Sequence, residues 1–170
     1  TYAVTIEDIK QYIEKENNVF FENKIVTINK LKEILKEKSN KKTVFTNGCF
    51  DIFHVGHSRY LREAAKLGDI LIVGVNSDAS VKRLKGKERP VMNEKERMEL
   101  LASLEFVSYV VMFEEDTPIQ LIKEIKPDII TKGGDYKPEE IVGADIVESY
   151  GGQVIVCPYI ESKSTTSIIN

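Results

Sequence analysis

One segment near the start of the chain, residues 43–57, constrains the fold more than any other. Near its start, Val44 and Phe45 favour a buried strand. Asn47-Gly48 follows and tolerates the positive φ angle of a sharp turn. Apolar and small residues then recur at helical spacing from 58 to 67. The segment therefore predicts a strand, a tight turn and a helix, which is the repeating unit of an α/β fold.

Short apolar runs alternate with helical patterns over the rest of the chain. Further strands are expected at residues 69–76, 106–112, 128–131 and 153–156, and helices at 80–85, 93–104, 117–125 and 138–150. Asn93 and Glu96 have the spacing of a helix-capping pair. Regular alternation implies right-handed crossovers, so we predict an α/β fold with a Rossmann-like, doubly wound parallel sheet of about five strands.

The first forty residues differ from this pattern. Residues 5–9 and 28–35 carry apolar side chains at helical spacing with charged residues between them, which predicts two amphipathic helices joined by the aromatic stretch at 19–21. We place a helical N-terminal extension at residues 1–40 and one domain at 41–170, since 170 residues suit a single α/β unit. The extension either covers the sheet or meets a second subunit.

The two histidines of the chain, His54 and His57, both fall in the first strand-to-helix turn. A helix amino terminus presents free N–H groups to anions, and residues three apart share a helix face. Gly56 has no Cβ to obstruct a ligand. The pair therefore predicts a phosphate site, in which surrounding phosphates would favour the charged imidazoles. No third ligand has a familiar zinc spacing, so no metal site is predicted.

Composition narrows the function classes. The formal net charge is −3, and the sequence has no basic stripe that could neutralise the phosphates of a nucleic acid or of an anionic membrane. The apolar runs are too short to span a bilayer, and no leader-like sequence opens the chain, so a soluble cytoplasmic protein is expected. Cys49 and Cys157 are too few for a disulfide framework.

Several motifs together resemble those of the cytidylyltransferase-like nucleotidyltransferases. They are Gly48-Cys49-Phe50-Asp51, His54-Val55-Gly56-His57, Lys132-Gly133-Gly134-Asp135-Tyr136 and Ser164-Thr165-Thr166. The resemblance covers residues 41–170 and is closest to the adenylyltransferase domain of bacterial ADP-heptose synthase, chiefly through residues 76–86 and 113–118. It implies transfer of AMP from ATP to D-glycero-β-D-manno-heptose 1-phosphate, giving ADP-heptose for the lipopolysaccharide core and pyrophosphate.

The resemblance also assigns residue roles. His54, His57 and Lys85 would be catalytic, with Lys82 as a rival to Lys85. Nucleotide contacts would come from Asn47, Gly48, Cys49, Phe50, Gly56, Lys132, Gly133, Asp135, Ser164, Thr165 and Thr166. Sugar-phosphate contacts would come from Asp51, Asp78 and Arg97.

The expected cofactor is Mg²⁺, which would enter with ATP and be bound mostly by phosphates and water. The expected partners are ATP, a phosphorylated sugar and a second copy of the chain. A sugar kinase, to which such domains are often fused, would act in the same pathway as a separate protein.

Three other functions stay open at this point. The nearest is a cytidylyltransferase that acts on glycerol phosphate or a related polyol phosphate. The second is a nucleotide-binding domain without catalysis. The third is a hydrolase with Cys49 as nucleophile, which is disfavoured because the chemistry of the resembled family proceeds without an enzyme nucleophile.

Overall fold

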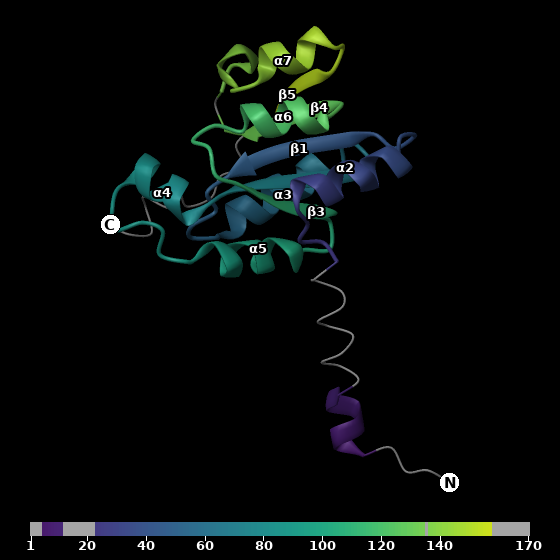
Figure 1. Cartoon of the computed structure of the whole chain (residues 1–170), viewed down its shortest axis with the longest axis vertical. Coiled ribbons are helices and arrows are strands. Elements are labelled where there is room, and N and C mark those ends of the chain that lie inside the picture. Colours follow the sequence, from purple (N-terminus) through teal and green to yellow (C-terminus); the bar gives the residue numbers. More distant parts are fainter. Residues whose placement is uncertain (1–4, 12–22, 135, 158–170) are drawn as a thin grey trace.

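A five-stranded, entirely parallel sheet forms the centre of the molecule (Figure 1), in a computed structural model that describes residues 5–11, 23–134 and 136–157. The strand order is β3-β2-β1-β4-β5. The strands are β1 (Thr43–Gly48), β2 (Ile70–Asn76), β3 (Tyr109–Phe113), β4 (Ile129–Gly133) and β5 (Gln153–Cys157). This arrangement confirms the predicted doubly wound α/β fold.

Helices connect the strands and cover both faces of the sheet (Figure 1). They are α2 (Ile28–Glu37), α3 (Val55–Ala65), α4 (Asp78–Lys85), α5 (Glu94–Ala102), α6 (Ile119–Ile125) and α7 (Ala144–Ser149), with a short 3₁₀ helix, η1, at Pro138–Glu140. The predicted capping pair at the start of α5 is confirmed, because Asn93 and Glu96 each accept the other's backbone N–H, at 3.0 Å and 3.3 Å.

The helix predicted at 138–150 is instead two short elements, η1 and α7. Gly143 lies between them with a φ of +92°, in the left-handed region that an α-helix interior does not use. The prediction of one continuous helix was wrong, because the apolar spacing hides this single glycine break.

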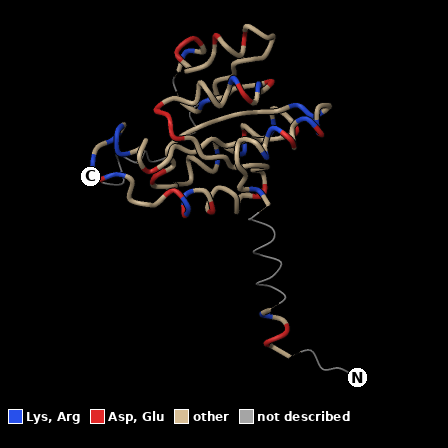
Figure 2. Tube along the Cα trace, in the orientation of Figure 1, with Lys and Arg blue, Asp and Glu red and all other residues tan. Residues whose placement is uncertain are grey.

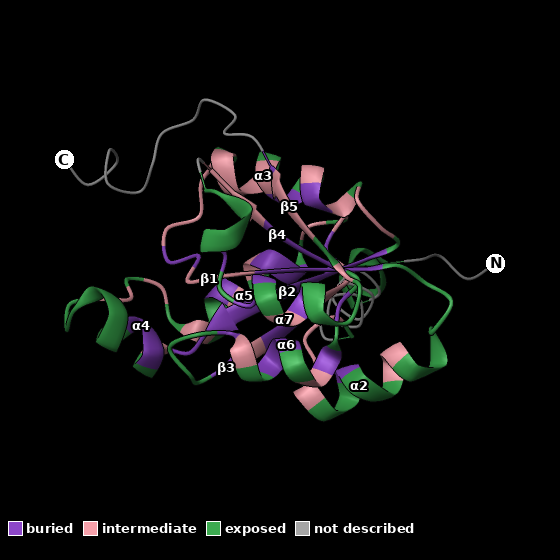
Figure 3. Ribbon diagram, turned by 90° about the horizontal axis from the view of Figure 1, so that it is seen from above, coloured by how far each residue is buried: buried purple, intermediate pink, exposed green. Residues whose placement is uncertain are grey.

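Alternating residues along the strands feed two cores, one on each face of the sheet. Phe45 and Ile72 point to the core beneath α2, α6 and α7, whereas Val44 and Leu71 point to the core beneath α3 and α5. Figure 3 shows the buried residues along the strands and the inner faces of the helices. Because both faces are covered, β2 is a continuous apolar run rather than an alternating one.

Residues 24–37 belong to the same unit as the sheet. Backbone bonds join this segment to β3, from Val26 N–H to the Val110 carbonyl at 3.0 Å and from Val110 N–H to the Lys24 carbonyl at 2.8 Å. Leu31 of α2 is 0% exposed within the core beneath α2, α6 and α7. The boundary drawn at residue 40 therefore cuts through a continuous core. Residues 6–11 are helical, and 19–21 lie outside the described residues.

The strand order reverses between β1 and β4, since the chain moves outward to β2 and β3 and then returns to the other side of β1. In open parallel sheets, the crevice beyond the carboxyl ends of the strands at such a point binds ligands. Asn47-Gly48 and Lys132-Gly133 end the two strands there. Within the described ranges, no helix has the length and apolar character that crossing a membrane requires.

Replacing Leu31 with Ala tests whether α2 is part of the core. We expect a loss of about 2–5 kcal/mol in the free energy of unfolding, because a fully buried leucine leaves a cavity. Urea denaturation measures this, with Ile6→Ala as the control at a 75% exposed position. Equal effects of the two substitutions would show that α2 does not contribute to the folded core.

Candidate functional site

The two histidines cap the first turn of α3 reciprocally. His54 is the N-cap residue, and its Nδ1 accepts a hydrogen bond from the N–H of Gly56 at 3.1 Å. The N–H of His54 in turn donates to Nδ1 of His57 at 3.3 Å. The ring centroids lie 3.9 Å apart, so the two imidazoles form one tilted pair.

These two bonds fix the proton position on each ring. Because Nδ1 of both histidines accepts from a backbone N–H, the proton of each neutral ring lies on Nε2. Each ring therefore carries one Nε2–H donor on the side away from its cap bond. Charging either ring would place a proton on Nδ1 and break a cap bond. The pair can thus donate two hydrogen bonds to an anion without being charged.

Aromatic side chains enclose His57. Phe53 stacks on its ring with centroids 5.4 Å apart, and Phe50 meets it edge-on at 5.4 Å. Burial, followed by the positive charges of His54 and Lys85, lowers the pKa of His57 to about 4. Burial also lowers the pKa of His54. Both imidazoles are therefore neutral at neutral pH in the free protein. The prediction of charged rings concerned a different state, in which phosphates surround them.

The turn before the histidines has an unusual backbone. Phe50 has a φ of +48° and a buried side chain, and its ring lies against Gly48. A Cβ on Gly48 would lie 3.0 Å from that ring, so a larger residue would displace it. Contact between the Phe50 ring and Gly48 thus helps to determine the shape of the turn Gly48-Cys49-Phe50. Asn47 and Gly48 end β1, Cys49 follows them, and Gly56 lies in the first turn of α3.

The end of β4 is bonded to the end of β1. Lys132 Nζ donates to the backbone carbonyl of Asn47 at 2.7 Å and to its side-chain Oδ1 at 3.2 Å. Burial lowers the pKa of Lys132 to about 8, although Cys49 acts in the opposite direction. A lysine with this pKa is still mostly protonated at pH 7, so it brings a positive charge to the crevice.

Tyr60 ties the histidine helix to both strands. Its hydroxyl lies 2.7 Å from Oγ1 of Thr46, and burial raises its pKa well above the usual range. Its ring fills the space beside Gly133, where an added Cβ would lie 2.7 Å from the ring. Tyr60 is not among the residues predicted for the site, although its position three residues after His57 places both on one face of α3.

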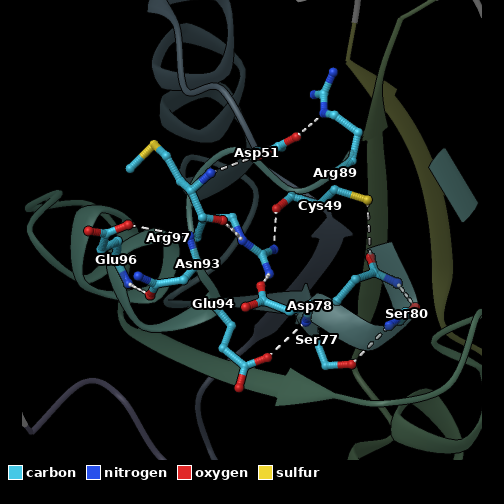
Figure 4. A network of polar contacts seen from close by, with 12 residues as sticks. Cys49, Asp51, Ser77, Asp78, Ser80, Arg89, Asn93, Glu94, Glu96 and Arg97 are labelled. Atoms are coloured by element: carbon cyan, nitrogen blue, oxygen red, sulfur yellow. Dashed lines mark hydrogen bonds and ion pairs between the residues drawn. The ribbon is translucent and has the colours of Figure 1, made fainter. Parts of the chain in front are cut away.

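Arg97 was expected to bind sugar phosphate, but it lies fully buried beneath the turn. Its exposed fraction is 0%, and its guanidinium donates to three protein oxygens (Figure 4). These are the carbonyl of Met92 at 3.0 Å, the carbonyl of Cys49 at 2.6 Å and Oδ1 of Asp78 at 2.7 Å. The geometry thus favours a positioning role, in which Arg97 joins the nucleotide turn to the start of α4.

The carboxylate of Asp51, like the guanidinium of Arg97, is bonded to other groups of the protein. Its side chain accepts the backbone N–H groups of Val91 at 2.6 Å and Met92 at 3.2 Å, together with Nε of Arg89. Burial alone would raise the pKa of Asp51, but these hydrogen bonds outweigh it and the pKa lies below its usual value. The carboxylate therefore anchors the loop after α4 to the turn before His54.

Lys85 ends α4, and its charge contributes to the low pKa of His57. Two hydrogen bonds of the Ser80 hydroxyl attach α4 to neighbouring segments. Asn76 donates to Oγ of Ser80 at 3.0 Å, and Ser80 donates to the carbonyl of Glu115 at 3.0 Å. Lys82, the rival candidate, lies one turn earlier on the same helix.

Four predicted nucleotide contacts fall on residues that the structure does not describe. Asp135, Ser164, Thr165 and Thr166 lie outside the described residues. In the part of the chain that is described, no three His, Cys, Asp or Glu side chains converge as metal ligands.

Replacing Phe53 with Ala tests the cause of the low His57 pKa. We expect the pKa to rise from about 4 toward 6.5, because water would reach the ring. Nitrogen-15 NMR measures the titration and the tautomer together, and Phe106→Ala removes an aromatic ring elsewhere as the control. An Nδ1–H tautomer, or titration of wild-type His57 near 6.5, would contradict the cap geometry.

The same shift predicts how stability depends on pH. Between pH 6.5 and about 4 the unfolded chain binds a proton at His57 that the folded chain does not. The contribution of His57 to the free energy of unfolding therefore decreases as the pH falls through this window.

Two curated proteins are similar to this chain over almost its whole length. Bifunctional protein HldE of Campylobacter concisus is 52% identical over 167 residues, covering 98% of this chain and 34% of the relative. HldE of Nitratiruptor sp. is 53% identical over 169 residues, covering 98% and 36%. The chain thus spans about a third of the length of these curated relatives.

Two solved structures are similar to this chain in fold. The lipopolysaccharide core biosynthesis protein of Thermoplasma volcanium has a TM-score of 0.58 and 33% identity, and the match covers 72% of this chain and 99% of that one. A pantoate-β-alanine ligase from Francisella tularensis, at 16% identity and a TM-score of 0.57 over 84% and 68% of the two chains, shares the fold. The cytidylyltransferase-like family model matches residues 45–169. This chain therefore belongs to the cytidylyltransferase-like family.

Proposed function

We propose that this nucleotidyltransferase transfers AMP from ATP to D-glycero-β-D-manno-heptose 1-phosphate and releases pyrophosphate. The observation that carries the proposal is the histidine pair at the start of α3, directly after β1, in which the cap bonds occupy Nδ1 and leave an Nε2–H donor on each ring. The substrate rests on the resemblance to the adenylyltransferase domain of ADP-heptose synthase and on relatives named HldE at about 50% identity. The product would serve synthesis of the lipopolysaccharide core.

In the proposed reaction, a phosphate oxygen of the sugar attacks the α phosphorus of ATP. A new P–O bond forms as the bond to the β-phosphate oxygen breaks, and pyrophosphate leaves with that electron pair. Such a transfer needs alignment and charge stabilisation more than covalent catalysis. His54 and His57 would donate to the α-phosphate oxygens, and Lys85 would neutralise the departing charge. Cys49 would line the nucleotide turn without acting as a nucleophile.

The remaining predicted contacts complete the proposed nucleotide site. Asn47, Gly48, Phe50 and Gly56 would approach the nucleotide from the β1 turn. Lys132, Gly133 and Asp135 would approach it from the end of β4, and Ser164, Thr165 and Thr166 would hold its outer phosphates. Mg²⁺ would enter as part of the MgATP substrate, with phosphates and water as its main ligands.

The proposed setting is the cytoplasm, where the chain would act as a homodimer. The resemblance pairs this activity with a sugar kinase. The chain spans about a third of the bifunctional relatives, and the rest of their length leaves room for such a second activity. The kinase would supply the phosphorylated sugar that this chain consumes.

A matrix of substrates tests the reaction. We expect pyrophosphate release with ATP and heptose 1-phosphate, and at least about 100-fold lower kcat/KM when CTP replaces ATP or glycerol 3-phosphate replaces the sugar. Preference for CTP with glycerol 3-phosphate would overturn the assignment in favour of the polyol-phosphate alternative. Tight ATP binding without product from any acceptor would indicate a non-catalytic domain.

Single substitutions of the histidines test the donors. His54→Asn keeps a capping acceptor for α3 but removes the Nε2 donor, so the fold should persist while kcat falls by about 10²–10³-fold. We expect a similar loss for His57→Asn. Steady-state kinetics with heptose 1-phosphate measures both, and the melting temperature checks the fold. His54→Gln is the matched control, because its amide can approach the position of Nε2. An unchanged kcat after replacing both rings with Asn would contradict the proposed mechanism.

A further inference from the structure

Arg89 has a guanidinium that is anchored at one end and unused at the other. Its Nε donates to Oδ2 of Asp51, whose side chain is 1% exposed. Among the described residues, no hydrogen bond involves its two terminal amino groups, and Figure 4 shows them directed away from Asp51 and the rest of the network. The side chain of Arg89 is 20% exposed, so these donors are held in place but open to a ligand.

The anchor is unusually firm because Asp51 has several partners. The same carboxylate accepts the N–H groups of Val91 and Met92, which keep it ionised and fix its orientation. Arg89 is held at its backbone as well, since its N–H donates to the carbonyl of Gly86 at 3.1 Å. A guanidinium fixed in this way loses little conformational freedom when it binds an anion.

The contact with Asp51 attaches Arg89 to the turn that leads into His54. Its anchor, Asp51, lies three residues before His54, and Arg89 follows Lys85 along the loop after α4. Figure 2 shows basic residues concentrated on α4 and this loop, which include Lys82, Arg83, Lys85, Lys87 and Arg89. Arg89 is the one among them that a buried carboxylate orients.

The reaction needs a cation for the attacking sugar phosphate, and Arg97 is not free to supply it. All three of its described bonds go to protein oxygens, and it has no exposed surface. Arg83 also differs, because its terminal amino group donates to the carbonyl of Glu114 at 2.6 Å. The two terminal amino groups of Arg89 make no such bond within the described ranges. Their planar fork matches two oxygens of a phosphate monoester.

We infer that Arg89, oriented by Asp51, binds the phosphate of the acceptor sugar and so determines affinity for the second substrate. This inference rests on the proposed function and assigns the acceptor subsite to a residue outside the recognised motifs. Lys85 and the histidines would act on the phosphates of ATP, while Arg89 would hold the attacking phosphate beside them.

Substituting Arg89 separates acceptor binding from nucleotide binding. We expect Arg89→Gln to raise the KM for heptose 1-phosphate about 10–100-fold while the KM for ATP changes less than about 3-fold, because a charge-assisted, two-point contact is lost. Arg89→Lys keeps the charge without the fork and should fall between wild type and Gln. Calorimetric titration of heptose 1-phosphate, with a non-hydrolysable ATP analogue present, should show the same order of Kd values.

Lys95→Gln is the matched control, because it removes one positive charge from an exposed position on α5. Its KM for heptose 1-phosphate should remain within about 3-fold of wild type, as expected for a screened surface charge. The inference is wrong if Arg89→Gln behaves like Lys95→Gln, or if it raises the KM for ATP and for the sugar equally. Melting temperatures of all variants show that the comparison is made between folded proteins.

One further measurement separates this inference from the proposed function. If wild type makes no ADP-heptose, the proposed function fails, and the phosphate site is then tested with inorganic phosphate alone. NMR of the arginine Nε–H signals should show a shift of Arg89 on titration with phosphate in the wild type. No shift of Arg89 would refute the site itself.

Discussion

The pair of backbone-to-imidazole hydrogen bonds at the start of α3 is the interaction on which the proposed chemistry depends. A helix start leaves N–H groups without partners, and here histidine nitrogens satisfy two backbone donors in that region where Ser or Asp usually would. The same bonds orient both rings and set their tautomers. Helix capping and the proposed chemistry are therefore linked at these positions, since the nitrogens that cap the helix determine which ring nitrogens carry the donor protons.

Much of the fold follows from the sequence because its signals are local. The apolar run of β2 and the Asn93–Glu96 cap need only neighbouring residues, and both lie where the sequence predicted them. The continuity of α7 with η1 was misjudged because apolar spacing says nothing of the φ angle at Gly143. The boundary at residue 40 missed the pairing of residues 24–26 with β3, which depends on a partner about 85 residues away in the chain.

The site was predictable in its motifs but not in its internal contacts. His54 and His57 are identified by spacing and by a strand-to-helix context, which the sequence contains. The sequence shows that Arg97 is charged but not that Cys49 and Asp78 come together around it. Arg89 carries no motif, and its distinction from nearby lysines arises only when the chain folds and Asp51 meets it. Long-range contacts thus decide that Arg97 is fully buried while the side chain of Arg89 stays partly exposed.

The contact between Tyr60 and Gly133 links two positions that lie far apart in the sequence. The aromatic ring occupies the volume that a side chain on the glycine would need, and its hydroxyl is bonded to the adjacent strand. A side chain at residue 133 would therefore need a smaller residue than tyrosine at position 60. A chain that enlarged residue 133 while keeping the tyrosine would have to shift the ring, and with it the histidine helix that carries it, away from the sheet.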